Sequence, residues 1–382
     1  MARCLHRRRG LARVKVAHVV TKFDVGGAQT HVTELAIAQR ASGMDVRVIA
    51  GVDGPAAERV RQAGISVAIV DQLGAAHGRL IQRAAFTAVR NALAVEVPDI
   101  VHAHSSHAGL MARLAARRDG YHSVYTAHGW PFQAGAAWKQ RLASFAGEFL
   151  GGHIGDAVIC LTEAEADRAR RARVVPKRRI WVVPNGIADV PVALRRVGPA
   201  DPLASPVLVM VARFAPPKLQ LELLAVAESL GERAWTLRLI GDGPGLDDCR
   251  SRVSSSALLA DRVELLGHRD DVPELLASSD IGLLWSRYEG LPISVMEQMR
   301  AGLACVASDL PGTRVLFGDE FAGVVAASID DLSRVLVDLL DDPARIDQLG
   351  SAARRRYEMS YSADAMLVAT NEVYAAVTGC TP

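Results

Sequence analysis

The sequence alternates short β-rich runs with helical stretches from residue 14 onward, and this alternation constrains the fold more than any other feature. Runs such as Val14–Val20 and Pro206–Val211 are almost continuously apolar, as strands buried on both faces of a sheet usually are. Strands that alternate with helices along a chain favour parallel sheets with helices packed on both faces. We therefore expect an α/β fold with doubly wound, Rossmann-like sheets.

The alternation occurs twice, once in each half of the chain. The strands expected in the first half are Val14–Val20, Asp45–Ala50, Ser66–Val70, Ile100–His104, Val124–Thr126, Ala157–Leu161 and Ile180–Val183. Those expected in the second half are Pro206–Val211, Thr236–Ile240, Val263–Leu266 and Asp280–Ser286. The stretch between them, 187–206, is polar, contains proline and lacks periodicity, which is typical of a linker.

A chain of 382 residues is too long for one ordinary hydrophobic core and suits two domains. We expect an N-terminal domain over 14–192 and a C-terminal domain over 193–361. The last segment, 362–382, is expected to form a helix that packs back on the first domain. Residues 1–13 carry five arginines and lack the apolar segment of a secretion signal, so a disordered basic leader or a misassigned start is expected there.

The composition excludes several classes of protein. No apolar run approaches about 18 residues, so no membrane span is expected. The five cysteines are scattered and form no C-x-x-C pair, which argues against a disulfide framework or a zinc-cysteine site. We expect a cytoplasmic protein that can associate peripherally with the inner face of the cell membrane.

The formal net charge of +2 conceals an uneven distribution. Residues 1–192 hold 26 of the 44 lysines and arginines and 15 of the 42 acidic residues, a balance of +11, against −9 for residues 193–382. Without the five arginines of residues 1–13 the first half still carries +6. Chance is one explanation, and an anionic membrane or lipid-phosphate partner is the other. Nucleic acid is not expected, because the basic residues are not interleaved with aromatic ones.

Two glutamates eight residues apart, Glu289 and Glu297, form the strongest candidate site. Glu289 lies in Tyr288–Pro292, between an expected strand and a helix whose first turn suits the proline. The amides of Gly290 and Leu291 would then point out of the helix N-terminus, where they can hold a phosphate. Carboxylates beside them can accept hydroxyl groups of a sugar. The alternative is that Glu297 is an ordinary solvated helix residue.

Cations and glycines follow two other expected strands. Arg213 and Lys218 come after Pro206–Val211, where a guanidinium fork and an ammonium point charge could hold a diphosphate. Gly243, in the turn Gly241–Pro244, permits close approach of the backbone to a ligand. Each signal alone is weak, because surface cations and glycines in tight turns are common.

Taken together, these motifs resemble glycosyltransferase family 4, whose GT-B architecture consists of two Rossmann-like domains facing across a cleft. The resemblance runs from Val14 to about Ala375. In the second half it rests on Ala212-Arg213, Pro217-Lys218, Gly241–Pro244 and the E-x7-E element from Glu289 to Glu297. In the first half it rests on Asp24–Gln29, Thr126–Gly129 and Pro184–Gly186. The chain departs from the family pattern at Ala212 and Leu219, where glycine is usual.

The resemblance implies a role for each matching residue of the second half. Arg213 and Lys218 would hold the diphosphate of a nucleotide-sugar donor and stabilise its charge during catalysis. The Gly243 turn and the amides of the E-G-L-P loop would lie beside it. Glu297 would bind the ribose hydroxyls, and Glu289 would contact the transferred sugar as a catalytic residue.

In the first half, the resemblance implies that Gly26 and Gly27 close over the donor diphosphate and that His128 touches the sugar near the reacting centre. The expected reaction is a retaining transfer from a nucleotide-diphosphate-sugar, with an acceptor that is a lipid-linked intermediate of bacterial surface polysaccharide. Two alternatives stay open: a nucleotide-sugar epimerase of the same architecture, and a non-catalytic nucleotide-sugar-binding protein.

No metal and no cofactor besides the nucleotide-sugar co-substrate are expected. The chain contains no D-x-D pair, which enzymes that hold a diphosphate through Mg²⁺ commonly supply. His102 and His104 would share one face of a strand, but no carboxylate partner is evident for them. The cations and helix amides are therefore expected to replace a metal.

Apolar residues recur at helical spacing at Trp138, Leu142, Phe145 and Phe149, with Lys139 and Arg141 to one side. Core packing is the default interpretation of such a stripe. The alternative is that Trp138, Lys139, Arg141 and Phe145 contact the acceptor or the membrane.

Overall fold

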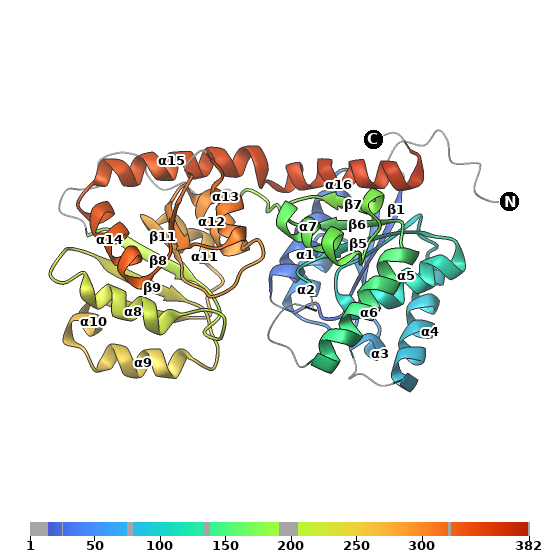
Figure 1. Cartoon of the computed structure of the whole chain (residues 1–382), viewed down its shortest axis with the longest axis horizontal. Coiled ribbons are helices and arrows are strands. Elements are labelled where there is room, and N and C mark those ends of the chain that lie inside the picture. The colour runs from blue at the N-terminus through green and yellow to red at the C-terminus, as the bar shows by residue number, and fades with distance from the viewer. Residues whose placement is uncertain are drawn as a thin grey trace. The chain divides into compact units, whose positions relative to one another are not determined.

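The computed structural model describes residues 14–24, 26–74, 79–130, 132, 138–190, 205–319 and 322–380. The chain forms two compact units: Met1–Ala188 together with Ala363–Pro382, and Asp189–Ser362. In each unit a parallel sheet lies between layers of helices (Figure 1). The expected doubly wound α/β architecture is confirmed.

The strands of the first unit are β1 (Lys15–Val20), β2 (Asp45–Ala50), β3 (Ser66–Ile69), β4 (Ile100–Ala103), β5 (His122–Ala127), β6 (Ala157–Cys160) and β7 (Ile180–Val182). Its helices are α1 (Gly27–Ala41), α2 (Pro55–Gln62), α3 (Asp71–Gly74), α4 (Arg79–Val95), α5 (Ser106–Asp119), α6 (Trp138–Ile154), α7 (Glu163–Ala172), the 3₁₀ helix η2 (Lys177–Arg179) and α16 (Ala363–Thr378). Every strand expected in the first half is present.

All neighbouring strands of the first sheet are parallel, in the order β3-β2-β1-β4-β5-β6-β7. The winding therefore reverses between β1 and β4. Open α/β sheets bind ligands beyond the carboxyl ends of the strands at such a reversal. This edge of the first sheet is one of two places where a site is expected.

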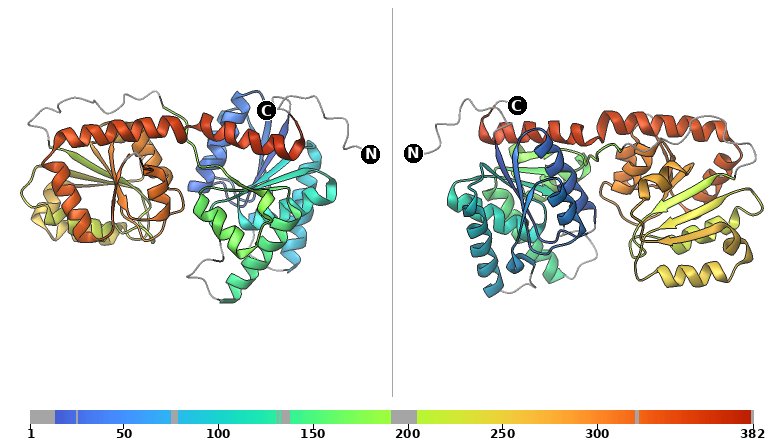
Figure 2. Two further views of the ribbon diagram at one scale, coloured as in Figure 1. Left: turned by 45° about the horizontal axis from the view of Figure 1, so that its top comes forward. Right: turned by 180° about the vertical axis from the view of Figure 1, so that it is seen from behind.

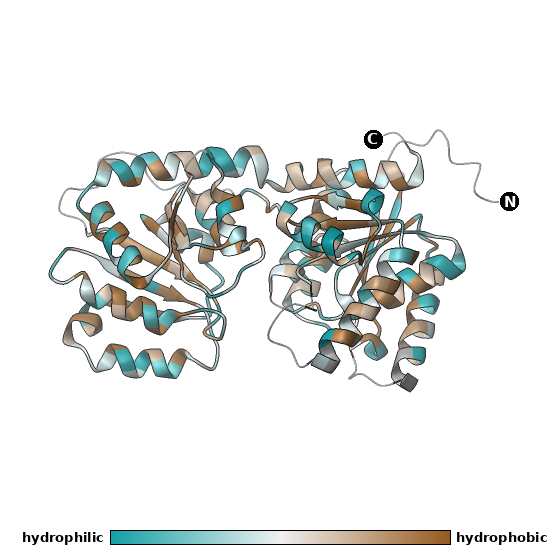
Figure 3. Ribbon diagram, viewed as in Figure 1, coloured by the Kyte–Doolittle hydropathy of each residue, from teal (hydrophilic) through white to brown (hydrophobic). Residues whose placement is uncertain are grey.

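Side chains from both faces of the first sheet are buried, because successive residues of a strand point to opposite faces. Ala17 and Val19 pack on one face with residues of α4 and α5. Val16 and Val20 pack on the other face with residues of α1 and α16. His18, between them in β1, shares this second face and is fully buried. Apolar residues are concentrated in the strands and polar ones on the outer helix surfaces (Figure 3).

The strands of the second unit are β8 (Val207–Val211), β9 (Thr236–Ile240), β10 (Val263–Gly267), β11 (Ile281–Leu284), β12 (Ala304–Ser308) and β13 (Val324–Ala326). Its helices are α8 (Gln220–Ser229), α9 (Leu246–Ser254), α10 (Ala257–Arg262), α11 (Val272–Ala277), α12 (Ile293–Ala301), α13 (Pro311–Phe317), α14 (Ile329–Leu340) and α15 (Pro343–Ser360). Two further directions of view show the sheet and its helices in each unit (Figure 2).

The second sheet is also parallel throughout, in the order β10-β9-β8-β11-β12-β13, with the reversal between β8 and β11. Strands β12 and β13 were not predicted from the sequence. Ala304–Ser308 has one β-branched residue, and Val324–Ala326 is three residues long, so neither carries a strong strand signal. Burial between α-helices, rather than local propensity, makes Ala304–Ser308 a strand.

Candidate active site

The loops that follow β8 and β11 meet at the carboxyl edge of the second sheet, where its winding reverses. Leu219 N donates to Trp285 O at 3.1 Å, and Arg287 N donates to Pro217 O at 3.0 Å. Lys218 and Ser286 form an antiparallel bridge between the same two loops. These bonds hold residues about 70 positions apart at one point of the sheet edge, at the place where doubly wound sheets bind ligands.

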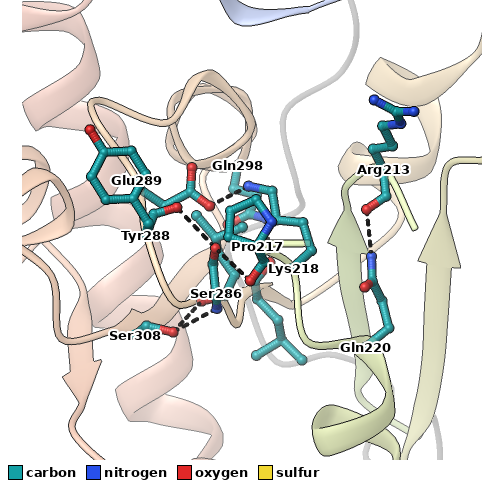
Figure 4. Close-up of polar contacts among 11 residues, drawn as sticks. Arg213, Pro217, Lys218, Gln220, Ser286, Tyr288, Glu289, Gln298 and Ser308 are labelled. Carbon is teal, nitrogen blue, oxygen red and sulfur yellow. Dashed lines mark hydrogen bonds and ion pairs between the residues drawn. The ribbon is translucent and has the colours of Figure 1, made fainter. Parts of the chain in front are cut away.

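Lys218 and Glu289 form an ion pair at this junction, with Lys218 Nζ donating to Glu289 Oε1 (Figure 4). Only 17% of the Lys218 side chain and 11% of the Glu289 side chain are exposed, so solvent screens the pair less than it screens an ordinary surface pair. The structure thus brings together two residues that the sequence analysis placed in one site. The ammonium group can bind phosphate oxygens, and the carboxylate can accept sugar hydroxyls.

Arg213 lies on the same loop as Lys218, but its side chain points away from the ion pair (Figure 4). Its side chain is exposed, and its backbone oxygen accepts a hydrogen bond from Gln220 Nε2 at 2.9 Å. Arg213 and Lys218 therefore lie on one loop, as predicted, but their charged groups are not close together in the structure (Figure 4).

The turn after β9 packs on the Arg213 loop. Phe214 N donates to Asp242 O at 2.9 Å, and Gly245 N donates to Phe214 O at 2.8 Å. Gly243 has a φ of +148°, and a Cβ atom added there would lie 2.5 Å from Phe214 O. Glycine is required at this position because the two loop backbones touch, which is a packing reason independent of any ligand.

The E-G-L-P loop leads from β11 into α12. A Cβ atom added at Gly312, in the first turn of α13, would lie 1.7 Å from Gly290 O, so Gly290 is held tightly against that turn. Leu291 is buried, whereas Glu297 is half-buried on α12. Glu297 is thus not a fully solvated helix residue, although its expected contact with ribose stays a prediction.

The first unit holds the remaining expected site residues. Gly26 caps the N-terminus of α1, which begins at Gly27. Gly26 O accepts a hydrogen bond from Thr30 N at 2.9 Å. His128 follows β5 directly and is half-buried at the carboxyl edge of the first sheet. The expected contacts of these residues with a donor stay predictions.

His128 belongs to a cluster of five histidine rings between the first sheet and α1. His18 and His102 are register partners on β1 and β4, so their rings lie on the same face. The rings of His102 and His104 have centroids 4.2 Å apart, and those of His31 and His128 4.8 Å apart. The strand expected at Ile100–His104 does place His102 and His104 on one face, and the fold adds three rings from other elements.

Hydrogen bonds connect most of this cluster. His18 Nδ1 is 2.9 Å from His104 Nε2, and His18 Nε2 is 2.7 Å from Gln39 Oε1. His102 contacts the hydroxyls of Tyr374 at 2.7 Å and Thr126 at 2.8 Å. Because Gln39 Nε2 also donates to Tyr374 OH at 3.1 Å, the network links β1, β4, α1 and α16.

The histidine rings are neutral at pH 7. Burial lowers the pKa of His18 and of His31 from 6.5 to about 4, although their hydrogen bonds to Gln39 and Asn185 act in the opposite direction. Burial also holds the pKa values of His102, His104 and His128 well below 6.5, and the neighbouring rings add to this effect. A neutral imidazole ring carries no charge, and one of its two nitrogens has a lone pair.

Helix α6 presents an apolar face to solvent. Trp138 is 70% exposed, Leu142 61% and Phe149 44%, whereas Phe145 packs against the core. Core packing therefore accounts for Phe145 and not for its neighbours along the stripe. Arg141 is exposed and its Nε donates to Phe132 O at 3.3 Å, while the side chain of Lys139 lies outside the described residues. Among the described helices none is both long enough and apolar enough to cross a membrane.

Four residues of the histidine cluster and its hydrogen-bond partners were not predicted from the sequence: His18, His31, Gln39 and Asn185. One signal was available: His18 stands inside a strand expected to be buried on both faces, where a polar side chain needs a partner. His31 carries no comparable signal, because helix positions become neighbours of a strand only through packing.

Two protein families match the chain, one in each half. Residues 26–186 match the family described as a glycosyl transferase 4-like domain, and residues 196–356 match the glycosyl transferases group 1. The match in the second half includes the Lys218–Glu289 pair and the E-x7-E element.

Relatives and solved structures agree with these matches. The chain is 30% identical over 259 residues to UDP-Gal:alpha-D-GlcNAc-diphosphoundecaprenol alpha-1,3-galactosyltransferase of Escherichia coli, covering 64% of this chain and 67% of that protein. It is 27% identical over 392 residues to alpha-maltose-1-phosphate synthase of Mycolicibacterium smegmatis, covering 92% and 96%. The crystal structure of Anabaena HepE in complex with UDP has the same fold, with a TM-score of 0.79 at 18% identity over 95% of this chain and 100% of that one.

Proposed function

The chain belongs to the group 1 glycosyltransferases with a family 4-like N-terminal domain, and we propose that it moves a sugar from a nucleotide-diphosphate-sugar to a lipid-linked saccharide of bacterial surface polysaccharide. The E. coli relative is named for a diphosphoundecaprenol acceptor and a UDP-sugar donor, which supports both halves of this proposal. The basic first half of the chain suits an acceptor that carries a diphosphate.

The observation that carries the proposal is the ion pair between Lys218 and Glu289 at the carboxyl ends of β8 and β11. Breaking the bond between the sugar and the diphosphate places negative charge on the departing phosphate. A fixed ammonium group at that phosphate stabilises the charge without reorganising water, which is the largest single catalytic effect in many enzymes. Glu289 holds Lys218 in position and offers its second oxygen to the sugar.

We infer that transfer proceeds with retention at the anomeric carbon. The bond from that carbon to the diphosphate oxygen breaks, and a bond to the acceptor oxygen forms on the same face. The proton of the acceptor hydroxyl passes to the departing diphosphate, so no protein nucleophile is needed. No pair of carboxylates at the spacing of retaining glycosidases was evident in the sequence, which favours this route over a covalent intermediate.

Incubation of the full chain with UDP-galactose, with and without a diphosphoundecaprenol-linked sugar, tests the function. We expect UDP release and glycolipid formation in equal amounts, and only when the acceptor is present. Isomerisation of the donor in the absence of acceptor would instead identify an epimerase. Donor binding without turnover across a panel of donors and acceptors would identify a binding protein.

Replacing Glu297 by alanine should mainly raise the KM for the donor. Ribose contacts change little between the bound donor and the transition state. Their loss therefore weakens binding of the donor and of the transition state equally, and kcat stays nearly unchanged. Steady-state kinetics with UDP-galactose measures both constants. Glu274→Ala, on α11 of the same unit, is the control, and an unchanged KM in Glu297→Ala would remove Glu297 from the donor site.

Binding of the donor diphosphate should not need Mg²⁺ or Mn²⁺, since a lysine and helix amides are proposed to hold it. Calorimetric titration with UDP should give the same Kd in EDTA and in millimolar Mg²⁺. A Kd that rises at least tenfold in EDTA and recovers with Mg²⁺ or Mn²⁺ would show that a metal bridges the diphosphate. The readout is nucleotide binding alone, so it is independent of any other metal site.

We also propose that the apolar face of α6 contacts an anionic membrane. Trp138, Leu142 and Phe149 are exposed on one helix of the unit that carries the positive balance. Apolar side chains that dip into the interface, together with lysines and arginines worth about 1 kcal/mol each near an anionic surface, give reversible binding.

The full chain should sediment with anionic vesicles, not with neutral ones, and several hundred millimolar salt should release it because the attraction is screened. Leu142→Ser and Arg141→Glu should each reduce sedimentation severalfold. Leu221→Ser is the matched control, since Leu221 is an equally apolar exposed residue on α8 of the second unit. Equal sedimentation with both lipids, or equal loss in the control, would remove α6 as the contact.

A further inference from the structure

Among the described residues, three buried ring nitrogens of the histidine cluster of the first unit have no hydrogen-bond partner. They are His31 Nε2, His104 Nδ1 and His128 Nε2. One ring nitrogen from each of these residues lies within 4.8 Å of the other two. His31 and His104 are each only 1% exposed. A buried acceptor that lacks a partner loses its hydration without compensation, so three such atoms at one point need an explanation.

The contacts of His31 determine which of its nitrogens carries the lone pair. His31 Nδ1 is 2.9 Å from Asn185 Oδ1, an oxygen that can only accept. Nδ1 therefore carries the proton of the neutral ring, and Nε2 carries the lone pair. A histidine whose second nitrogen donates to a carbonyl oxygen is the usual form of a metal ligand.

The tautomer of His104 is determined through His18. Gln39 Oε1 accepts at 2.7 Å from His18 Nε2, so His18 Nδ1 carries the lone pair of that ring. His18 Nδ1 in turn accepts at 2.9 Å from His104 Nε2, which must then be protonated. The lone pair of neutral His104 is left on Nδ1, the buried nitrogen that has no hydrogen-bond partner among the described residues.

We propose that His31 Nε2, His104 Nδ1 and His128 Nε2 bind one divalent transition-metal cation of the zinc class. Imidazole nitrogens suit Zn²⁺, and a tetrahedral ion about 2.1 Å from each nitrogen would hold them roughly 3.4 Å apart. The three nitrogens lie within 4.8 Å of one another, so they would need to approach by up to about 1.4 Å. A second group of close histidines, His18, His102 and His104, is a poorer choice because both nitrogens of His18 and of His102 already have partners.

The position of this site in the fold suits a metal with an open coordination position. His104 follows β4 and His128 follows β5, at the carboxyl edge beside the reversal of the first sheet. His128 is half-buried while the other two are closed off, so a fourth ligand from solvent would enter on its side.

The expectation that the chain holds no metal rested on the absence of a D-x-D pair and, for the histidines, on His102 and His104, for which no carboxylate partner was evident. The fold supplies His31 from α1 and His128 from the loop after β5. This inference goes beyond the proposed sugar transfer, and metal content tests it without any measure of transfer.

The test is zinc binding to the full, untagged chain after removal of metals with a chelator. Dialysis against zinc chloride followed by elemental analysis should give one zinc ion per chain, and cobalt chloride should produce the visible absorption of a four-coordinate site. Asn185→Ala should weaken zinc binding about 10- to 100-fold, because Asn185 orients a ligand without being one. His268→Ala is the control: this exposed ring lies 3.5 Å from Asp270 and could take up zinc adventitiously.

His31→Gln and His128→Gln should each abolish stoichiometric binding, with near-UV circular dichroism reporting whether the fold is kept. His128 is the more accessible of the two, so its variant remains informative if His31→Gln does not fold. Absence of bound zinc in the native chain would overturn the inference and leave water as the partner of the three nitrogens. Zinc binding that survives both His31→Gln and His128→Gln would also overturn the inference. Loss of zinc binding in His268→Ala would do the same.

Discussion

Lys218→Ala should lower kcat/KM by about 30- to 1000-fold, since the loss of one preorganised stabiliser of developing charge costs roughly 2–4 kcal/mol. The substitution removes the ammonium group that would face the departing diphosphate. It also leaves Glu289, which is 11% exposed, without its partner. Steady-state transfer assays measure the effect.

Lys218→Arg should recover only part of this loss, because a planar fork replaces a compact charge and does not fit the same contact with Glu289. Arg287→Ala is the matched control: it removes a cation from the loop after β11, but its side chain is 74% exposed and pairs with Glu222 at 3.4 Å. Arg213→Ala should cost a similar amount if its exposed side chain turns toward bound diphosphate. Native kcat/KM in Lys218→Ala would remove the ion pair from the catalytic site.

Acidification from pH 7 to pH 5 should destabilise the first unit by several kcal/mol. Burial holds the pKa of His18 and of His31 at about 4, whereas each titrates near 6.5 in the unfolded chain. Below pH 6.5 the unfolded state binds protons that the folded state does not, so stability falls until about pH 4 and is fully present above pH 6.5. At pH 5 each of these two rings contributes about 2 kcal/mol of destabilisation.

The second unit is an internal control for this effect, because it contains one histidine, the exposed His268. Calorimetry in the presence of a chelator should show the melting transition of the first unit falling between pH 7 and pH 5. That of the second unit should change much less. Parallel shifts of both transitions would mean that the histidine cluster does not control acid stability.

The sequence alone determined the architecture and the residues proposed for the donor site. Continuous apolar runs separated by helices indicate parallel strands. Helices cover both faces of a parallel sheet, so the side chains on both faces of its strands are apolar. Two strands, β2 and β9, were predicted with the bounds that they have in the structure. The E-x7-E element and the cations after β8 were recognisable because they occupy strand-to-helix loops, whose position at a sheet edge follows from the alternation itself.

Only the tertiary structure decided which side chains meet. The contact of Lys218 with Glu289 depends on β8 and β11 being neighbours, and strand order cannot be read from a list of strands. The same holds for His31, His104 and His128, which come from a helix and two loops and converge only when α1 packs on the sheet. Local sequence sets the shape of each element and the face that it buries. Long-range packing sets the distances between elements, and chemistry depends on those distances.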